Sequence, residues 1–435
     1  MKVDLHYSRS LVSLEIPEAN VEEIVRPWHQ EGKADNKSVV RQAMTSGEIE
    51  NFQDEIAGKR LCVLTDDGTR DEPFDDMFEH LFGALRKSSL VRFVICTGTH
   101  SAETQQNNRI AELIKEAATK AGIRNFSVHT HNCEHDTFIE AGRTSRGTEI
   151  MFNVQVDDAE VFLVLSDVKV HYFAGYSNPI KNFVPGICSY GTTEQNHSLA
   201  LNEESTFGVH PWHRIRDRRY NPLADDQLEG MQLIVKDRPV YALVTISTSA
   251  RIQWARFGPV DRVSAEAFGI IDAMNTRTVK PLGRLIVSPG GMPNDMSLYI
   301  AQRALELTKN AVKDGGEILF VAACPDGIGE KQTIENFYNR LTAPIDEILK
   351  SIESGYQLYN HKPYKFARMI HRLRRIWMYS EIPDSLIEAA HLYSTCEPQV
   401  VVDHWLAEDP DAKIRVVDGA NKIALYPLKS SKFER

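Results

Sequence analysis

The chain has 435 residues, of which 42% are hydrophobic and 25% charged, and its formal net charge is −10. These values are typical of a globular protein and exclude a disordered, fibrous or coiled-coil chain, while the length predicts two domains. Lys and Arg are scattered apart from the short runs 214–219 and 371–377, so we do not expect a nucleic-acid partner.

The cysteines and the hydropathy pattern exclude further classes. The six cysteines lie far apart and include no Cys-x-x-Cys pair, which gives no support for a disulfide framework or a zinc ribbon. The N-terminus lacks an apolar signal core, and no run of about 18 apolar residues occurs that would span a bilayer. We therefore expect a cytoplasmic protein without a membrane partner.

Several short apolar runs end abruptly in small or polar residues and predict buried parallel strands. They lie at 60–70, 91–100, 160–171, 283–293 and 317–327. Apolar residues at helical spacing predict helices over 101–123 and 297–312, with Ser101 and Ser297 as candidate N-caps. Strands that alternate with helices indicate an α/β fold.

We place the domain boundary near 276–283, where an amphipathic segment ends and a new strand begins. This predicts an N-terminal α/β domain over 1–277 and a C-terminal α/β domain over 278–411. Residues 412–435 are expected to complete the first domain as a closing hairpin with a Gly-Ala-Asn turn.

Polar residues follow three of the predicted strands, at the rim where open α/β sheets bind ligands. The turn DDGTR holds Asp67, Thr69 and Arg70, which combine a carboxylate, a hydroxyl and a guanidinium suited to binding an anion. The same residue types are ordinary turn formers, so the motif by itself does not distinguish an anion-binding site from a structural turn.

Two histidines end predicted strands, His100 and His171. A neutral histidine near a helix N-terminus is a candidate general base, and two on opposite faces of a carbon are what a racemase needs. A single such residue is more often a capping or packing group.

Lys181 lies among apolar neighbours and is a candidate nucleophile for covalent attachment, although a surface lysine is the commoner case. His197 is either a metal ligand or a polar residue that starts a helix. No glycine-rich dinucleotide fingerprint follows any predicted strand.

The segments DDGTR (66–70), TGTH (97–100), HYFAGYSNPIKNFVPGI (171–187) and EQNHS (194–198), in this order, resemble the nickel-dependent lactate racemase family. The similarity extends through SPGGMPNDMSLYIAQRA (288–304). It implies two α/β domains with a cofactor and substrate cleft between them.

The resemblance also implies a nickel pincer nucleotide, a pyridinium mononucleotide whose two thio-acid arms hold nickel. By position, Lys181 would carry this cofactor covalently and His197 would be the protein's nickel ligand. Thr69 would contribute to the cofactor site, and Phe173 and Pro185 would be walls for the pyridinium ring.

In the implied reaction, His100 and His171 are the acid/base pair of an isomerase that inverts C2 of a 2-hydroxy acid. One takes the hydroxyl proton while hydride moves to the cofactor, and a transient 2-oxo acid receives hydride on its other face. Arg70 would bind or polarise the substrate, and Asp67 would support the site.

The sequence departs from lactate racemase on the substrate side. Tyr299 agrees with the family pattern, but Arg303 stands where that enzyme has Lys, and Ile300 where it has Gln. The expected tryptophan is replaced near 361–366. Because Arg offers a planar fork, we expect a racemase or epimerase for another 2-hydroxy acid, a sugar acid such as gluconate or a dicarboxylate such as malate.

Two other functions remain open. With Lys181 unmodified, the same residues could run a metal-assisted dehydration or lyase reaction on hydroxy acids, and a non-catalytic nickel or nucleotide carrier would need only the tether and the ligand. The expected partners are a small-molecule substrate and the cofactor-maturation enzymes, for a monomer or homodimer.

Overall fold

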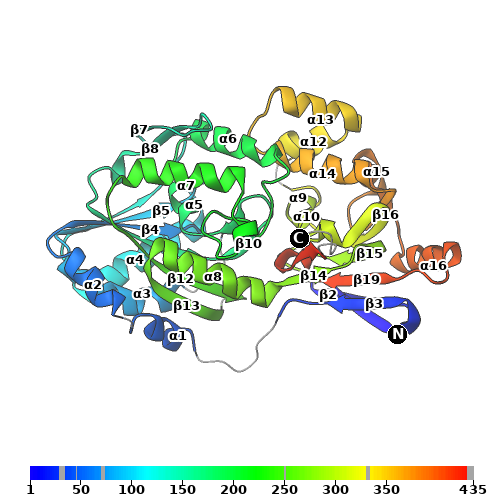
Figure 1. Ribbon diagram of the computed structural model, residues 1–435, viewed down its shortest axis with the longest axis horizontal. Coiled ribbons are helices and arrows are strands. Elements are labelled where there is room, and N and C mark those ends of the chain that lie inside the picture. Colours follow the sequence, from blue (N-terminus) through cyan, green and yellow to red (C-terminus); the bar gives the residue numbers. More distant parts are fainter. Residues whose placement is uncertain (29–34, 46, 70–73, 249–250, 330–333, 429–435) are drawn as a thin grey trace. The chain divides into compact units, whose positions relative to one another are not determined.

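The computed structural model describes residues 1–28, 35–45, 47–69, 74–248, 251–329 and 334–428. The chain divides into two compact units, coloured along the sequence in Figure 1. We call Gln30–Asp272 the central unit, and Met1–His29 with Ala273–Arg435 the terminal unit. Arg70 falls outside the described residues.

The central unit is built on a six-stranded sheet with the order β13-β12-β9-β4-β5-β6. Neighbouring strands run parallel except for β13, which is antiparallel to β12. The strands are β4 (Arg60–Asp66), β5 (Leu90–Cys96), β6 (Phe126–Thr130), β9 (Val161–Asp167), β12 (Val240–Thr248) and β13 (Arg251–Pro259).

Two antiparallel pairs stand apart from this sheet, β7 with β8 and β10 with β11. Their bounds are β7 (Phe138–Arg143), β8 (Glu149–Asn153), β10 (Lys169–His171) and β11 (Gly175–Ser177). The helices of the central unit are α1 (Asn36–Ala43), α2 (Glu48–Glu55), α3 (Phe74–Leu81), α4 (Gln105–Ala121), α5 (Ile180–Phe183), α6 (Tyr190–Ser198), α7 (Pro222–Val235) and α8 (Val260–Asn275).

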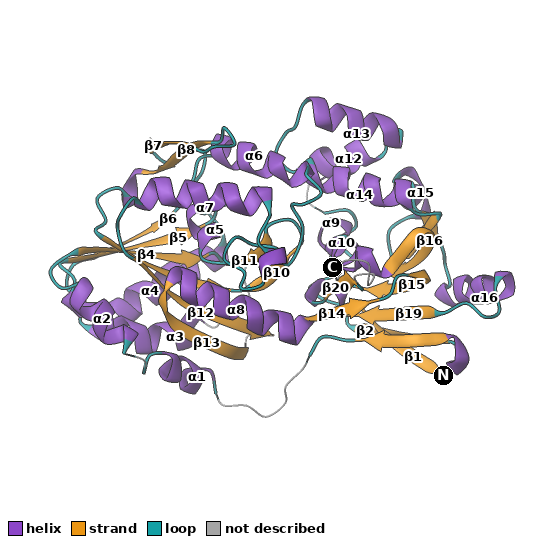
Figure 2. Ribbon diagram, in the orientation of Figure 1, coloured by secondary structure: helices purple, strands orange, loops and turns teal. Residues whose placement is uncertain are grey.

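Helices cover both faces of the central sheet (Figure 2). Successive side chains of a strand point to opposite faces. On β9, Leu163 packs in the core that α1 to α4 complete, whereas the ring of Phe162 lies 5.4 Å from that of Phe183 on α5. Every residue of β9 is buried because both faces of the strand are covered. A strand in this position is apolar throughout, which explains the continuous apolar run in the sequence.

The terminal unit holds a second six-stranded sheet, entirely parallel, with the order β18-β17-β16-β15-β19-β3. Its strands are β3 (Val21–Val25), β15 (Leu282–Ser288), β16 (Val312–Val321), β17 (Arg375–Tyr379), β18 (Tyr393–Ser394) and β19 (Ile414–Asp418). Two further pairs are β1 (Lys2–Tyr7) with β2 (Ser10–Glu15) and β14 (Thr276–Val279) with β20 (Ala424–Pro427).

Short helices surround this sheet. They are α9 (Leu298–Ala301), α10 (Arg303–Thr308), α12 (Asn339–Leu341), α13 (Ile345–Ser354), α14 (His361–Arg372), α15 (Asp384–Ala389) and α16 (Pro398–Glu408). A hydrophobic cluster formed by β1, β2, α16 and the sheet includes the fully buried Trp405. No helix of the described segments is both long and apolar enough to cross a membrane.

The α/β prediction and its parallel strands are confirmed, but three local expectations are wrong. Helix α4 begins at Gln105 with Thr104, not Ser101, as its cap, because Thr104 accepts the N–H of Asn107. The helix expected over 297–312 breaks at Gln302. The closing hairpin is absent, since β19 pairs with β15 and β3, and β20 with β14, all in parallel.

The structure also divides the chain differently from the expected domains 1–277 with 412–435, and 278–411. The first 29 residues and the C-terminal segment both belong to the terminal unit. Strand β3 extends the same sheet as β19, so the two ends of the chain complete one layer.

Candidate active site in the central unit

Asp67 and His100 follow the neighbouring parallel strands β4 and β5 and form a pair. Nδ1 of His100 lies 2.8 Å from Oδ2 of Asp67. Asp67 is 3% exposed, whereas the side chain of His100 is 52% exposed. Because a carboxylate only accepts, the proton of the neutral imidazole sits on Nδ1, and Nε2 is left with a lone pair. This is the tautomer that a general base requires.

Thr69 holds the other oxygen of Asp67. Its hydroxyl donates to Oδ1 at 2.5 Å, and its backbone N–H donates to the same atom at 3.3 Å. In this structure Thr69 therefore orients the carboxylate that orients His100.

Asn107 joins the two loops that carry this pair, a role that the sequence patterns did not reveal. Its amide oxygen accepts the N–H of Gly68 at 2.8 Å, and its amide nitrogen donates to the carbonyls of Ser101 and Ala102 at 3.1 Å each. A Cβ on Gly68 would lie 2.3 Å from Cβ of Gln106, so this approach requires glycine.

Phe173 contacts both of the other predicted histidines. Its ring centroid lies 4.5 Å from that of His171 and 5.3 Å from that of His197, edge-on in both cases. Phe173 is 4% exposed, so it forms a buried apolar wall between two imidazoles.

His171 has the tautomer opposite to that of His100. The backbone N–H of Ala174 donates to Nδ1 of His171 at 3.3 Å. The proton of neutral His171 therefore sits on Nε2. His100 therefore presents a lone pair at Nε2, whereas neutral His171 presents an N–H there.

Lys181 and His197 influence each other electrostatically. Burial, and after it the charge of Lys181, lowers the pKa of His197 to about 3, with a smaller lowering from His100 and an opposing hydrogen bond to the backbone of Thr193. His197 is therefore neutral, which is the form that ligates metals. These three predicted site residues are brought into one neighbourhood.

Asp66 fixes the short helix α5 that carries Lys181. It accepts hydrogen bonds from the amide of Asn182 at 2.9 Å, the N–H of Asp167 at 3.1 Å and the hydroxyl of Ser166 at 3.3 Å. One carboxylate thus ties β4, β9 and α5 together next to Lys181. In the sequence, the only indication of this role is the position of Asp66 as the first residue of the DDGTR motif.

The loop after β5 is also tied to the segment after Lys181. The N–H of Gly98 donates to the carbonyl of Gly186 at 3.1 Å, and a Cβ on Gly98 would lie 3.4 Å from Cγ of Pro185. Gly98 has a φ of +57°. Pro185, predicted as a wall of the site, therefore lies against the loop that ends in His100.

Two buried amides secure the remaining segments. Asn196, next to His197, donates to Oδ2 of Asp226 at 2.8 Å and holds α6 against α7. Asn221 donates to the carbonyl of Phe173 at 3.0 Å. Gly175 has a φ of +75°, and a Cβ there would lie 2.0 Å from the carbonyl oxygen of Val209.

The predicted substrate residues Tyr299 and Arg303 belong to the terminal unit. Tyr299 lies on α9, and Arg303 is the first residue of α10. Both side chains are partly exposed.

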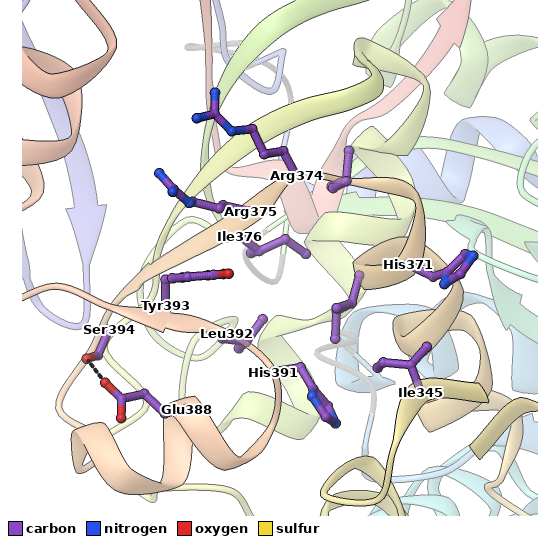
Figure 3. Close-up of a pocket in the computed structure, with 12 residues that line it drawn as sticks. Ile345, His371, Arg374, Arg375, Ile376, Glu388, His391, Leu392, Tyr393 and Ser394 are labelled. Atoms are coloured by element: carbon purple, nitrogen blue, oxygen red, sulfur yellow. Dashed lines mark hydrogen bonds between the residues drawn. The ribbon is translucent and has the colours of Figure 1, made fainter. Parts of the chain in front are cut away.

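The terminal unit also has a surface hollow between α13, α14, α15 and β18, which contains none of the predicted site residues (Figure 3). Several of its polar groups have partners: Ser394 donates to Glu388 at 3.2 Å, and His391 contacts the carbonyl of Ala343 at 2.8 Å. Arg374 bonds Glu408 at 2.8 Å. The hollow therefore adds nothing to the candidate site.

Within the described segments, no group of three or more His, Cys, Asp or Glu residues is arranged to hold a metal ion. His197 therefore belongs to no such group, and Lys181 is its charged neighbour.

Two family descriptions match the chain. The lactate racemase N-terminal domain matches residues 7–208, and the lactate racemase C-terminal domain matches residues 280–421. A lactate racemase of Thermoanaerobacterium thermosaccharolyticum is 26% identical over 77% of this chain and 76% of its own length. One of Lactiplantibacillus plantarum is 22% identical over 79% of each.

The fold is similar to that of a solved structure, the lactate racemase apoprotein from Thermoanaerobacterium thermosaccharolyticum. The TM-score is 0.82 at 20% identity, and the match covers 98% of this chain and 100% of the other. The two domain matches together span most of the sequence, in the expected order. The chain therefore belongs to the lactate racemase family.

Proposed function

We propose that the protein is an isomerase that inverts C2 of a 2-hydroxy acid, with His100 and His171 as its acid/base pair. The observation that carries the proposal is the opposite tautomers of the two neutral imidazoles, set by Asp67 at one and by the N–H of Ala174 at the other. Inversion needs one group that removes the hydroxyl proton and one that acts from the other side.

Each histidine has a defined task in this proposal. Nε2 of His100 takes the hydroxyl proton of one enantiomer, and Asp67 stabilises the imidazolium that forms. In the return step, His171 in its imidazolium form would give the Nε2 proton to the oxygen of the opposite enantiomer and become the neutral tautomer that accepts the N–H of Ala174. Arg70 would bind the substrate carboxylate, since a guanidinium fork matches a carboxylate.

The donor set fits a nickel pincer nucleotide. Lys181 would form the covalent link, the neutral imidazole of His197 would provide the protein's ligand to nickel, and the remaining nickel ligands would belong to the cofactor. Phe173 and Pro185 would contact the pyridinium ring of the cofactor, and Thr69 would contribute to the cofactor site. When bound, this cofactor supplies a hydride acceptor for C2, so that the substrate passes through a 2-oxo acid.

The substrate side includes Tyr299 and Arg303. Because an Arg replaces the Lys of lactate racemase at position 303, we propose a substrate other than lactate, a sugar acid such as gluconate or a dicarboxylate such as malate.

The first test is the intact mass of the chain after co-expression with the cofactor-synthesis enzymes and nickel. We expect the mass increment of a modified nucleotide on the native chain and on the control Lys115→Ala, an exposed position on α4, together with nickel by elemental analysis. Lys181→Ala should lack the increment. An increment on Lys181→Ala, or nickel without any increment, would contradict the proposed tether.

The second test separates hydride transfer from the competing lyase chemistry. The loaded enzyme is incubated with single enantiomers of malate, gluconate and lactate in D₂O. Hydride transfer inverts C2 without placing solvent deuterium at C2 or C3, whereas proton removal from C2 places deuterium at C2, and dehydration followed by rehydration places it at C3. No inversion of any 2-hydroxy acid by cofactor-loaded chain would favour the carrier function.

A further inference from the structure

His131 directly follows β6 and is fully buried. Nε2 of its ring lies 3.0 Å from the carbonyl oxygen of Cys188, and its own carbonyl accepts the hydroxyl of Thr97 at 2.6 Å. The ring of His131 therefore contacts the segment that follows Lys181, and its backbone contacts the loop that ends in His100.

The amide of Asn153 fixes the tautomer of His131. Its oxygen accepts the N–H of Gln155 at 3.0 Å, so its nitrogen faces the imidazole. This nitrogen, which only donates, lies 3.0 Å from Nδ1 of His131 and 2.6 Å from Oδ2 of Asp136. Oδ2 of Asp136 lies 3.5 Å from Nδ1 of His131, which is longer than an N–H···O hydrogen bond. The proton of neutral His131 therefore sits on Nε2 and is donated to Cys188.

Each end of this connection lies one hydrogen bond away from a predicted site residue. The carbonyl of Thr97 accepts the N–H of His100 at 3.0 Å. The N–H of Cys188 donates to the carbonyl of Pro185 at 2.8 Å. His131 thus links the turn that presents the candidate base to the turn that contains a proposed wall of the cofactor ring.

A separate bond joins the same two turns, from the N–H of Gly98 to the carbonyl of Gly186. A single hydrogen bond would leave the turns free to hinge about it, whereas two connections define their relative position. Because His131 and Cys188 are buried, losing the ring donor would leave the Cys188 carbonyl without a partner, and this has a cost.

We propose that His131 is a positioning residue that holds His100 at a fixed distance from segment 185–188. A base must lie within hydrogen-bond reach of the proton that it takes, and a misplacement of about 1 Å can cost about 100-fold in rate. The inference rests on the proposed function and deepens it, since His131 acts through His100 and does not contact the substrate.

The test compares two substitutions that separate the bonds of the His131 ring. In His131→Gln the amide nitrogen reaches the place of Nε2 and still donates to Cys188, whereas the bond from Asn153 to Nδ1 is lost. In His131→Asn the shorter amide reaches only the place of Nδ1, so the bond to Cys188 is lost. The control is His135→Asn, at an exposed position in the loop after β6.

Initial rates of C2 inversion by the full-length chain are normalised to the loaded fraction from intact mass. His131→Asn should lower kcat about tenfold or more and change KM by less than about twofold, because the base moves and the substrate-binding groups do not. His131→Gln should retain kcat within about threefold of the native value, since the bond to Cys188 remains. His135→Asn should have the native kcat and KM.

A second variant covers the case that His131→Asn does not fold, which circular dichroism would show. Thr97→Val removes the hydroxyl at the other end of the connection with little change in volume, and it should lower kcat about fivefold. Where both fold, adding Thr97→Val to His131→Asn should lower kcat by less than about twofold more, because both substitutions break one connection.

Amide exchange in the cofactor-free chain, labelled with ¹⁵N-glycine, reports the connection without any catalysis. In D₂O the amide of Gly98 should exchange about tenfold faster in His131→Asn than in the native chain or His131→Gln. The amide of Gly269, within α8, should exchange at the native rate in all of them. A loaded native chain that inverts no 2-hydroxy acid would overturn the proposed function, whereas unchanged exchange at Gly98 would overturn the inference by itself.

Other results would also overturn the inference. They are a native kcat in His131→Asn, equal losses of kcat in His131→Gln and His131→Asn, and the same loss in His135→Asn. A reduced loaded fraction with native kcat per loaded chain would assign His131 to cofactor attachment at Lys181 and not to the position of the base.

Discussion

Oδ2 of Asp67 lies 2.8 Å from Nδ1 of His100, and its other oxygen accepts the hydroxyl of Thr69. The pair joins the ends of two neighbouring parallel strands, so the sheet itself sets the distance. A buried carboxylate that orients an exposed histidine fixes the tautomer of the base and stabilises its protonated form.

Asp67→Asn should therefore lower kcat by about 100-fold or more, because an amide can donate to Nδ1 and place the ring proton on Nε2, where the base needs its lone pair. KM should change little. The measurement is the initial rate of C2 inversion by cofactor-loaded enzyme, normalised to cofactor occupancy from intact mass. Thr69→Val removes only a support of the carboxylate and should cost less than about tenfold. An Asp67→Asn enzyme with the native kcat would contradict the role of His100 as base.

Asn182→Ala should reduce attachment of the cofactor at Lys181. The substitution removes the amide that bonds Asp66 and leaves α5 without its tie to β4. We expect the loaded fraction, measured by intact mass, to fall several-fold while the far-ultraviolet circular dichroism stays native. Asn125→Ala removes a comparable bond to the carbonyl of Ser89, at an exposed position, and should leave loading unchanged. Equal loading of both variants would assign Asn182 a purely structural role.

Gly175 and Gly191 should respond in opposite ways to substitution by Ala. At Gly175 the added Cβ meets a backbone oxygen at 2.0 Å and the φ is +75°, so we expect a loss of about 2 to 4 kcal/mol in the free energy of unfolding. Gly191 lies within α6 with nothing within 4 Å of a built Cβ, and Ala should be neutral or stabilise by about 0.5 to 1 kcal/mol. Denaturant unfolding measures both, and equal effects would contradict the close contact at Gly175.

His210 should make stability depend on pH. Burial, and after it the charge of His213, lowers the pKa of His210 to about 3 in the folded chain from its usual 6.5. Between these values the unfolded chain binds the extra proton, so stability is fully present above about pH 6.5 and falls by up to about 1.4 kcal/mol per pH unit below it.

The check is denaturant unfolding of native chain and of His210→Asn from pH 7 to pH 4. The Asn side chain still accepts the N–H of Trp212, which bonds Nδ1 of His210 at 3.1 Å, but it does not titrate. Its stability should decline less steeply than that of the native chain. His135→Asn, at an exposed position, should show the same dependence of stability on pH as the native chain. If His210→Asn also showed that dependence, the imidazole of His210 would not be buried in its neutral form.

Much of the candidate site could be predicted because its residues lie in short continuous segments. DDGTR, TGTH and the segment 171–187 each contain the chemistry and the local turn that presents it. The pairing of Asp67 with His100 also follows from local information, since both residues end apolar runs that form adjacent parallel strands. What these motifs did not reveal were the groups that hold them, such as Asn107 and Asn221.

The amino-acid sequence by itself determined the α/β class, the buried strands and the positions of the candidate site residues, because apolar runs and turn residues act over a few neighbouring positions. Only the tertiary structure decided which distant segments pair. Asp66 and Asn182 are 116 residues apart, and β19 joins β15 and β3 where the local pattern indicated a hairpin. The sequence of an apolar strand does not specify which strand it pairs with, so the pairing depends on how the whole sheet is buried.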